Sequence, residues 1–196
     1  MGTSTTNKHR LTRDLQVSSI RAMEGEDRKF RLSFSSEEPY NRWFGNEILD
    51  HSEGCVNLER LETMGCVLFN HDRDEVLGKV TKVWIENNRG EAEIEFDTDK
   101  DAEKIYQKVK SGTLKGVSVG YKVDVWEEVL PNKQSSDGRF TGPCSIAKKW
   151  WPFEISIVSV PADATVGVGR EMEEPKNEQS LLPLYEKQLQ VNKNRD

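Results

Sequence analysis

Apolar and polar residues alternate along several short stretches of the chain, which is the pattern of a strand with one buried face. The clearest stretches are residues 30–34, 91–97 and 117–125, where apolar side chains stand at every second position. Residues 76–85 also fit a strand, and Asn87-Asn88-Arg89-Gly90 offers a turn between it and residues 91–97. We therefore predict a β-hairpin there and further strands on either side of it.

The pattern changes to helical spacing between the second and third of these stretches. Asp99 is a suitable N-terminal cap, and Gly112 is a suitable stop. Between them, four apolar residues recur three and four positions apart: Ala102, Ile105, Tyr106 and Val109. We predict an amphipathic helix over residues 99–111, followed directly by the strand at residues 117–125.

Other stretches are less regular. Arg42 to Leu49 fits a short helix or turn, and the alternation in residues 64–68 predicts a strand that leads to Asn70-His71-Asp72. A last strand is predicted from Glu154 to Val160. Many strands with one or two helices predict a mostly β fold with a few helices (α+β), built as a single barrel-like domain.

The 196 residues suffice for one domain with a real core and are too few for two ordinary ones. Residues 1–16 are polar and have no period, so we predict a disordered N-terminal segment before a domain over residues 17–169. Residues 131–147 are rich in Ser, Gly, Asn and Pro and predict a mobile loop. Residues 170–196 predict a flexible C-terminal tail. Four residues in it fit one side of a short amphipathic helix: Leu181, Leu182, Tyr185 and Leu189.

Charge and composition argue against several classes of protein. The net charge is −6, which speaks against a broad nucleic-acid surface. No apolar stretch has the length of a membrane-spanning helix or the pattern of a secretion signal, so we expect a soluble intracellular protein without a membrane partner. Three cysteines are few and odd in number, so they do not suggest a disulfide framework.

The run Gly116-Val117-Ser118-Val119-Gly120 matches the G-x-S-x-G pattern of α/β-hydrolases. That motif needs a strand before the serine and a helix after it, whereas here the predicted helix comes first and the strand follows. The hydrolase order of serine before histidine also fails, because His9, His51 and His71 all precede Ser118. A serine nucleophile served by an upstream histidine remains open, since such sites are defined by geometry and not by order.

A metal site is the rival from another class. His51, Cys55, Cys66 and His71 offer a ligand set that zinc favours. Neither half has the short Cys-x-x-Cys spacing of common zinc modules, and Cys66 lies in an alternating apolar run where a buried thiol is the ordinary explanation.

Several motifs, in order along residues 20–168, resemble those of the prohead maturation proteases of tailed bacteriophages, distant relatives of the herpesvirus capsid protease. These motifs are the segment Arg42 to Leu49, the His-Asp after an apolar strand with Gly78 beyond it, the acidic strand into a Thr-Asp capped helix, Gly-x-Ser-x-Gly-Tyr, and Glu-x-Ser-x-Val-x-x-Pro-Ala from Glu154. In this resemblance His71 falls on the family's histidine and Ser118 on its serine. Glu154 falls on the acidic third position, with Asp72 as the second choice.

The resemblance implies a serine endopeptidase with the herpesvirus protease fold, which needs no cofactor and no metal. It would act in the host bacterial cytoplasm, inside the procapsid. Its substrates would be a scaffold protein or the scaffold-like arm of the major capsid protein, and its own chain. A contact with the portal protein and a homodimer are further partners that the resemblance leaves open, as is a non-catalytic role in head assembly or as a scaffold protein.

The chemistry of the three residues agrees with this resemblance. The Ser118 hydroxyl needs a base at neutral pH, and the imidazole of His71 titrates near that pH. Glu154 would hold the imidazole in one tautomer and stabilise its charged form. Gly116 and Gly120 have no side chain, so we expect the backbone of a substrate to approach there.

Overall fold

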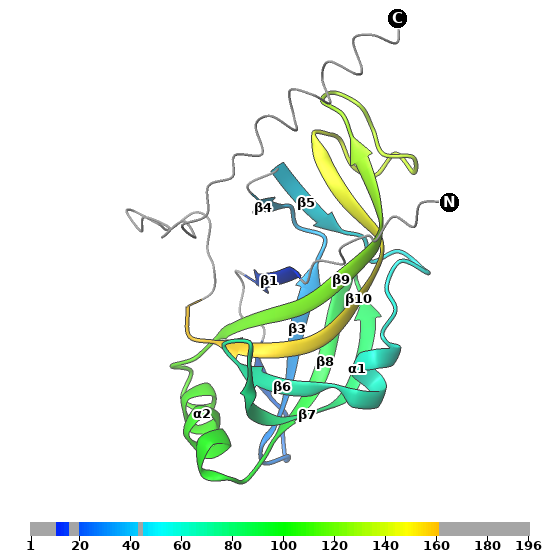
Figure 1. Ribbon diagram of the computed structural model, residues 1–196. Helices are drawn as coiled ribbons and strands as arrows, with labels where there is room; N and C mark the ends of the chain where they lie inside the picture. The colour runs from blue at the N-terminus through cyan, green and yellow to red at the C-terminus, as the bar shows by residue number, and fades with distance from the viewer. Residues whose placement is uncertain (1–10, 16–19, 43–44, 161–196) are drawn as a thin grey trace, which may run out of the picture. The chain divides into compact units, whose positions relative to one another are not determined.

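The computed structural model describes residues 11–15, 20–42 and 45–160, which fold mainly as strands (Figure 1). Contacts divide the chain into two units, residues 1–165 and residues 166–196. The second unit lies outside the described residues, and so do the predicted tail and its amphipathic helix. The described helices are α1 (Glu59–Met64) and α2 (Lys100–Lys110), and neither is long and apolar enough to cross a membrane. The described strands are β1 (Leu11–Leu15), β2 (Arg21–Ala22), β3 (Lys29–Ser36), β4 (Tyr40–Arg42), β5 (Gly45–Leu49), β6 (Cys66–Phe69), β7 (Asp72–Glu86), β8 (Arg89–Phe96), β9 (Gly116–Val129) and β10 (Cys144–Val158).

All the described strands belong to one sheet, in the order β1-β9-β10-β6-β7-β8-β3-β2, with β5 also paired to β10 and β4 paired to β5. The pairs of β10 with β5 and with β6 are parallel, and the other pairs are antiparallel. The predicted mostly β class with a few helices is confirmed. In the part of the chain that is described, however, no ladder joins β1 to β2, so the sheet is not closed into a barrel.

Strands β9 and β10 form a long antiparallel hairpin, paired from Cys144 opposite Val129 to Val158 opposite Gly116 (Figure 1). Strand β10 begins at Cys144 and not at Glu154 as predicted. Residues 144–147, which the prediction assigned to the loop, therefore belong to this strand. Pro152 tolerates a place within β10 because the register shifts between Pro152 and Glu154, where a bulge relieves the ladder of one hydrogen bond.

The main core joins one face of the sheet to residues of both helices, and α2 packs beside β7 and β8. The helix begins at its predicted cap, because the Asp99 carboxylate accepts hydrogen bonds from the N–H groups of Asp101 and Ala102. Its Tyr106 ring packs against Phe30 and Phe96, with ring centroids 6.1 and 5.8 Å away. The predicted helix and its apolar face are confirmed.

Two predictions about the first part of the chain are wrong. The described residues of the segment from Arg42 to Leu49 are strand and not helix or turn, because Arg42 ends β4, residues 45–49 form β5, and β5 pairs with both β4 and β10. Residues 43–44 lie outside the described residues. The N-terminal segment 1–16 is not wholly disordered, since Leu11–Leu15 form β1 along the edge of β9. Residues 1–10 and 16 lie outside the described part.

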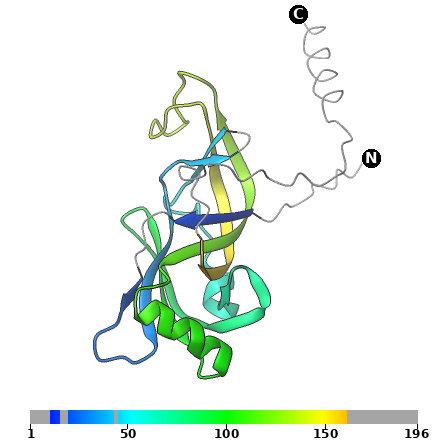
Figure 2. The ribbon, with the colours of Figure 1, turned by 90° about the vertical axis from the view of Figure 1, so that its left-hand side faces the viewer.

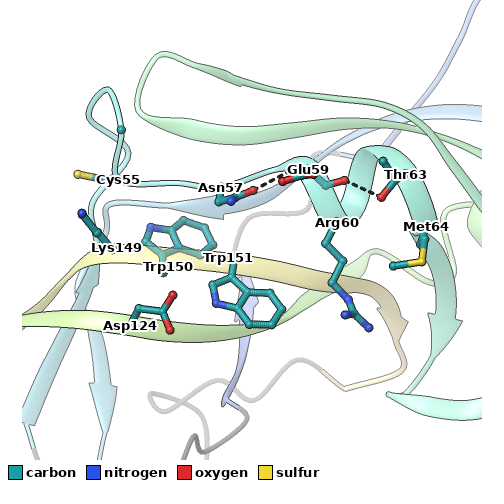
Figure 3. Close-up of a pocket in the computed structure, with 11 residues that line it drawn as sticks. Cys55, Asn57, Glu59, Arg60, Thr63, Met64, Asp124, Lys149, Trp150 and Trp151 are labelled. Carbon is teal, nitrogen blue, oxygen red and sulfur yellow. Dashed lines mark hydrogen bonds between the residues drawn. The ribbon is translucent and has the colours of Figure 1, made fainter.

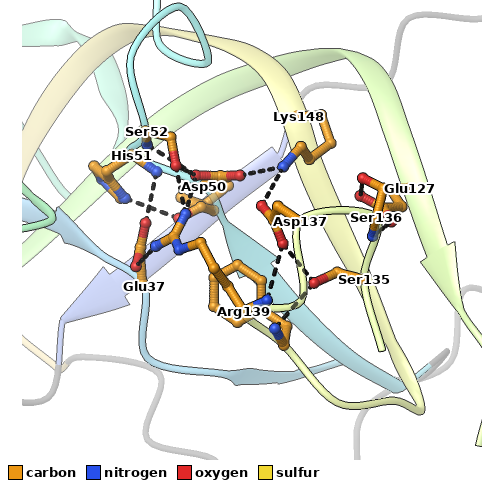
Figure 4. A network of polar contacts seen from close by, with 12 residues as sticks. Glu37, Asp50, His51, Ser52, Glu127, Ser135, Ser136, Asp137, Arg139 and Lys148 are labelled. Carbon is orange, nitrogen blue, oxygen red and sulfur yellow. Dashed lines mark hydrogen bonds and ion pairs between the residues drawn. The ribbon is translucent and has the colours of Figure 1, made fainter. Parts of the chain in front are cut away.

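A polar network ties the loop after β9 to the end of β5 (Figure 4). Asp50 is fully buried, and its two carboxylate oxygens pair with Lys148 at 2.6 Å and with Arg139 at 2.9 Å. Lys148 also pairs with Asp137 of the loop at 2.9 Å. Burial alone would raise the pKa of Asp50, but the hydrogen bonds from Lys148, Ser52 and Arg139 outweigh it and hold that pKa well below its usual range.

Candidate active site

His71 lies in the two-residue turn between β6 and β7. Phe69 and Asp72 are partners in the ladder, which leaves only Asn70 and His71 to connect the strands. Both turn residues have positive φ, 50° for Asn70 and 63° for His71. This backbone suits a tight hairpin turn, in which Asn-Gly is the favoured pair. Histidine at the glycine position is therefore unfavourable for the turn itself, and such strain is often retained at functional sites.

The end of β10 holds this turn in place. The N–H of Asn70 donates to the carbonyl of Ile157 at 3.0 Å, and the Asn70 side chain accepts from the N–H of Ser159 at 2.9 Å. The N–H of His71 donates to Oγ of Ser156 at 3.2 Å. These contacts fix the histidine over the face of β10 that points away from the main core.

The His71 ring contacts Glu154 on this face. Nδ1 of His71 lies 2.6 Å from Oε1 of Glu154, and the glutamate side chain is only 9% exposed. Because a carboxylate accepts hydrogen bonds, this contact places the ring proton on Nδ1 and the lone pair on Nε2. A second, longer contact of 3.4 Å runs from Oγ of Ser156 to Oε2 of Glu154. The imidazole is thus oriented as a base.

Gly120 makes room for this glutamate. Gly120 is the ladder partner of Glu154, and a Cβ atom at Gly120 would lie 2.5 Å from Oε1 of Glu154 and 2.7 Å from Cε2 of Phe153. No real side chain tolerates such distances. We expected this glycine to admit a substrate backbone, but the space above it is filled by the carboxylate of the same chain.

Ser118, the predicted nucleophile, lies on the same face of the sheet. Its ladder partner on β10 is Ser156, two residues from Glu154, and side chains of paired residues point to one side. Ser118 is fully buried, and its hydroxyl donates a hydrogen bond to the carbonyl of Arg13 in β1 at 3.1 Å. The structure thus brings Ser118, His71 and Glu154 to one face, with β1 beside the serine.

Asp72, the second choice for the acidic member, points elsewhere. Its side chain is exposed, and its carboxylate accepts a hydrogen bond from the N–H of Asp74 at 2.9 Å. Its carboxylate therefore forms a local turn at the start of β7. Glu154 is the carboxylate that contacts the ring of His71.

The four residues of the zinc hypothesis are not brought together. His51 is buried against Trp150, where Nδ1 donates to the carbonyl of Leu49 at 2.8 Å and Nε2 contacts Oγ of Ser35 at 2.7 Å. Burial lowers the pKa of His51 to about 4. Among the described residues, no group of three or more His, Cys, Asp or Glu side chains is arranged to hold a metal ion. His51 and Ser35 form a hydrogen-bonded Ser–His pair, but both side chains are buried in the fold.

Two adjoining pockets flank helix α1. A pocket of about 390 Å³ contains His71 and Glu154 at its wall, together with Thr12 of β1. A larger pocket of about 560 Å³ shares Arg60 and Met64 with it and extends toward Trp151 and Asp124 (Figure 3). The larger cavity therefore lies next to the His71–Glu154 pair and not at it.

Sequence reasoning missed two residues of this site. Ser156 links the backbone of His71 to the carboxylate of Glu154, and the motif Glu-x-Ser already contained it without a role. Thr12 was placed in a disordered segment, although it lines the His71 pocket. No pattern in residues 11–15 indicates a buried strand, because only its two end positions are apolar.

Comparison with known proteins adds independent findings. Residues 52–178 match the family described as caudovirus prohead serine protease. The chain is also 37% identical over 147 residues to a major capsid protein of Halomonas phage phiHAP-1, covering 73% of this chain and 23% of that protein. The chain thus spans about a quarter of the length of that relative. No solved structure matches the chain, so the likeness to the herpesvirus protease fold stays a prediction.

The family match includes the turn with His71, the strand with Ser118 and the strand with Glu154. The resemblance seen in the motifs is therefore confirmed at the level of the family. This chain belongs to the caudovirus prohead serine protease family.

Proposed function

We propose that this chain is a serine endopeptidase in which Ser118 is the nucleophile, His71 the general base and Glu154 the residue that orients the base. The observation that carries the proposal is the 2.6 Å contact between Nδ1 of His71 and Oε1 of Glu154, on the sheet face that also holds Ser118. A carboxylate, an imidazole and a hydroxyl with these roles form the general scheme of serine proteases.

In the proposed reaction, Nε2 of His71 removes the proton from Oγ of Ser118 as the oxygen attacks the carbonyl carbon of a peptide bond. Glu154 keeps its hydrogen bond to Nδ1–H and stabilises the imidazolium that forms. The imidazolium then gives its proton to the departing amine, which leaves an ester between Ser118 and the acyl part of the substrate. Attack by water, with His71 again as the base, releases the acid and restores the hydroxyl.

We infer that the substrate is capsid protein. The relative in phage phiHAP-1 is named as a major capsid protein, yet the matched stretch is only 23% of it. A protease segment and a capsid protein joined in one chain would meet during assembly. We extend this to a scaffold protein and to the chain itself, cut inside the procapsid in the host cytoplasm.

Co-expression with the capsid protein of the same phage tests this function. We expect Ser118→Ala and His71→Ala each to abolish cleavage, and the double variant to resemble either single variant, because nucleophile and base act as a unit. Ser145→Ala is the matched control, since Ser145 is also a buried serine but lies in β10, where its hydroxyl donates to Glu128 far from the site. Intact-mass measurement reads the products. Normal processing by Ser118→Ala would refute the serine mechanism, and loss of cleavage with EDTA would favour a metal site.

The acidic member has its own test in the same assay. Glu154→Gln should lower turnover by between about tenfold and about 10⁴-fold, because the amide no longer imposes one tautomer on His71. Asp72→Asn should leave turnover within about twofold, since its carboxylate caps a turn. The reverse ranking would reassign the third role to Asp72.

A further inference from the structure

The proposed nucleophile lies beneath a strand of its own chain. Ser118 has no exposed surface, and the hydrogen bond that its hydroxyl donates goes to the carbonyl of Arg13 at 3.1 Å. A serine in this state is not ready to give its proton to an imidazole. It also offers no space for the carbonyl of a substrate.

The strand that covers Ser118 occupies a sheet edge. Five positions of β1 pair with β9, from Leu11 opposite Tyr121 to Leu15 opposite Val117. Figure 2 shows β1 as the dark blue arrow beside the green ribbon of β9. Strand β1 ends the sheet, so its departure would leave β9 as the edge strand beside the site. An open edge is the surface on which an extended peptide adds as a further strand. The same backbone groups would thus bind a substrate segment.

Other contacts of β1 reach the site directly. Thr12 lines the pocket that holds His71 and Glu154. The Thr12 carbonyl accepts a hydrogen bond of 2.6 Å from Arg42, whose guanidinium also bonds the Tyr121 hydroxyl at 2.8 Å. Strand β1 is therefore held by a hydrogen bond from β4 as well as by its pairing with β9.

The side chain of Arg13 weakens the packing of β1 against the domain. The residue is only 3% exposed, yet its Nε and Nη1 atoms have no hydrogen-bond partner, and only Nη2 bonds, to the carbonyl of Glu38. Burial lowers the pKa of this guanidinium. A buried charged group with unpaired N–H atoms opposes the docking of its strand. The guanidinium also lies over the ring of Tyr40, 5.4 Å from its centroid, but this contact does not pair the two N–H groups. The unpaired groups therefore lower the free energy that is needed to displace β1.

We propose that the edge of β9 from Val117 to Tyr121 is the docking edge for an extended segment of the substrate, and that β1 occupies this edge as an internal competitor. The substrate segment would run antiparallel to β9, as β1 does. Cleavage then requires β1 to leave first. This inference rests on the proposed role of Ser118, and the test separates the two.

The test uses the full chain with Ser118→Cys, so that access to position 118 is read by thiol chemistry without any catalysis. Into it we introduce Asp14→Pro with Leu15→Pro. Alternate N–H groups of a strand face its neighbour, so prolines at two adjacent positions remove at least one ladder bond. Thr5→Pro with Thr6→Pro is the matched control, because it places the same two prolines outside the paired residues 11–15. Alkylation of the introduced thiol by iodoacetamide is followed by mass spectrometry of peptides.

We expect the Asp14→Pro/Leu15→Pro pair to raise the alkylation rate at position 118 by at least about tenfold, because that rate follows the population of the open state. The control pair should leave the rate unchanged. Equal rates in the two variants, with intact circular dichroism for both, would overturn the inference. If the proline pair unfolds the protein, the test is the hydrogen exchange of the β1 amides in the unaltered chain. Protection equal to that of the β10 amides would overturn the inference, and faster exchange would support it.

A peptide in trans tests the docking edge itself. A synthetic peptide of residues 9–17 should slow alkylation at position 118 in the proline variant, whereas a scrambled peptide should not. Failure of the peptide to slow alkylation would overturn the docking edge. The same prolines in the chain with Ser118 should speed labelling by a fluorophosphonate. Faster alkylation of the introduced thiol with no labelling of the serine would support the role of β1 as a competitor. The same result would refute the catalytic role of Ser118.

Discussion

Gly120 has a definite task at the scale of single residues, because it makes space for the carboxylate that orients His71. An added methyl group would lie 2.5 Å from Oε1 of Glu154, so Gly120→Ala must push the carboxylate off the ring. We expect turnover to fall by about tenfold to about 10⁴-fold, the range of losing the orienting acid. Peptide cleavage and the midpoint of thermal unfolding are measured together, since the loss should be far larger in rate than in stability.

The control for Gly120→Ala is the same change made in a Glu154→Ala background. If the methyl group acts through the carboxylate, it lowers turnover there by less than about twofold, because neighbouring changes that share one partner are not additive. A loss as large as in the wild-type background would mean that the methyl group acts through Phe153, the strand or the substrate and not through Glu154.

His51 predicts a dependence of stability on pH. Its pKa falls from 6.5 in an exposed histidine to about 4 in the fold, because burial disfavours the charged ring. Between these values the unfolded chain binds a proton that the folded chain refuses, so the free energy of unfolding decreases as the pH falls. The expected loss between pH 7 and pH 5 is about 2 kcal/mol, measured by urea denaturation at each pH.

One variant separates this effect from other titrations. His51→Gln should remove about 2 kcal/mol of the difference between pH 7 and pH 5, because the buried ring no longer titrates. An unchanged pH dependence in His51→Gln would show that the buried ring is not the group that titrates.

At the scale of elements, the sequence predicts those that bury one regular face. Helix α2 and strand β8 were predicted because their apolar residues follow periods of 3.6 and 2. Strand β5 was missed because it pairs with both β4 and β10, and Glu47, Ile48 and Leu49 are all buried, so no alternation remains. The early start of β10 was missed because Lys148, Lys149 and Pro152 break the alternation expected of a strand. In the structure the strand accommodates them through shifts of register, which the sequence does not show.

The loop between β9 and β10 depends on a buried ion pair, which gives a prediction for this element. Lys148→Met leaves the Asp50 carboxylate buried with Arg139 and Ser52 but without its closest cation, so we expect a loss of about 2 kcal/mol in the free energy of unfolding. Lys149→Met, at the exposed neighbouring position, should change it by less than about 0.5 kcal/mol. Urea denaturation at pH 7 compares them, and equal losses would contradict the structural role of the pair.

At the scale of the whole molecule, the candidate site joins residues that are far apart in the sequence. His71, Ser118 and Glu154 were predicted from a family resemblance, whereas the contact between His71 and Glu154 depends on the parallel pairing of β6 with β10. No local pattern reports such a pairing. That β1 covers Ser118 could not be predicted for a different reason. Strand β1 buries an arginine with unpaired N–H atoms, whereas sequence rules place charged side chains at the surface.

The C-terminal residues carry a prediction from the sequence alone, since they lie outside the described part of the chain. A short amphipathic helix with Tyr185 and Leu189 on its apolar side would bind scaffold or shell and recruit the enzyme during assembly. We expect deletion of residues 171–196 to leave cleavage of a free peptide unchanged and to lower the number of enzyme copies in purified procapsids by at least about tenfold.

A full-length pair of variants tests whether the apolar side of this segment matters. Tyr185→Glu with Leu189→Glu adds two negative charges on the predicted apolar side, and Gln190→Glu with Asn194→Glu adds the same charge on the opposite side, at the same spacing of four residues. Recruitment through an amphipathic helix requires the first pair to lose incorporation and the second to keep it, because apolar contact and not net charge would bind the shell. Equal losses would assign the effect to charge, and normal incorporation of the deleted protein would remove the recruitment role altogether.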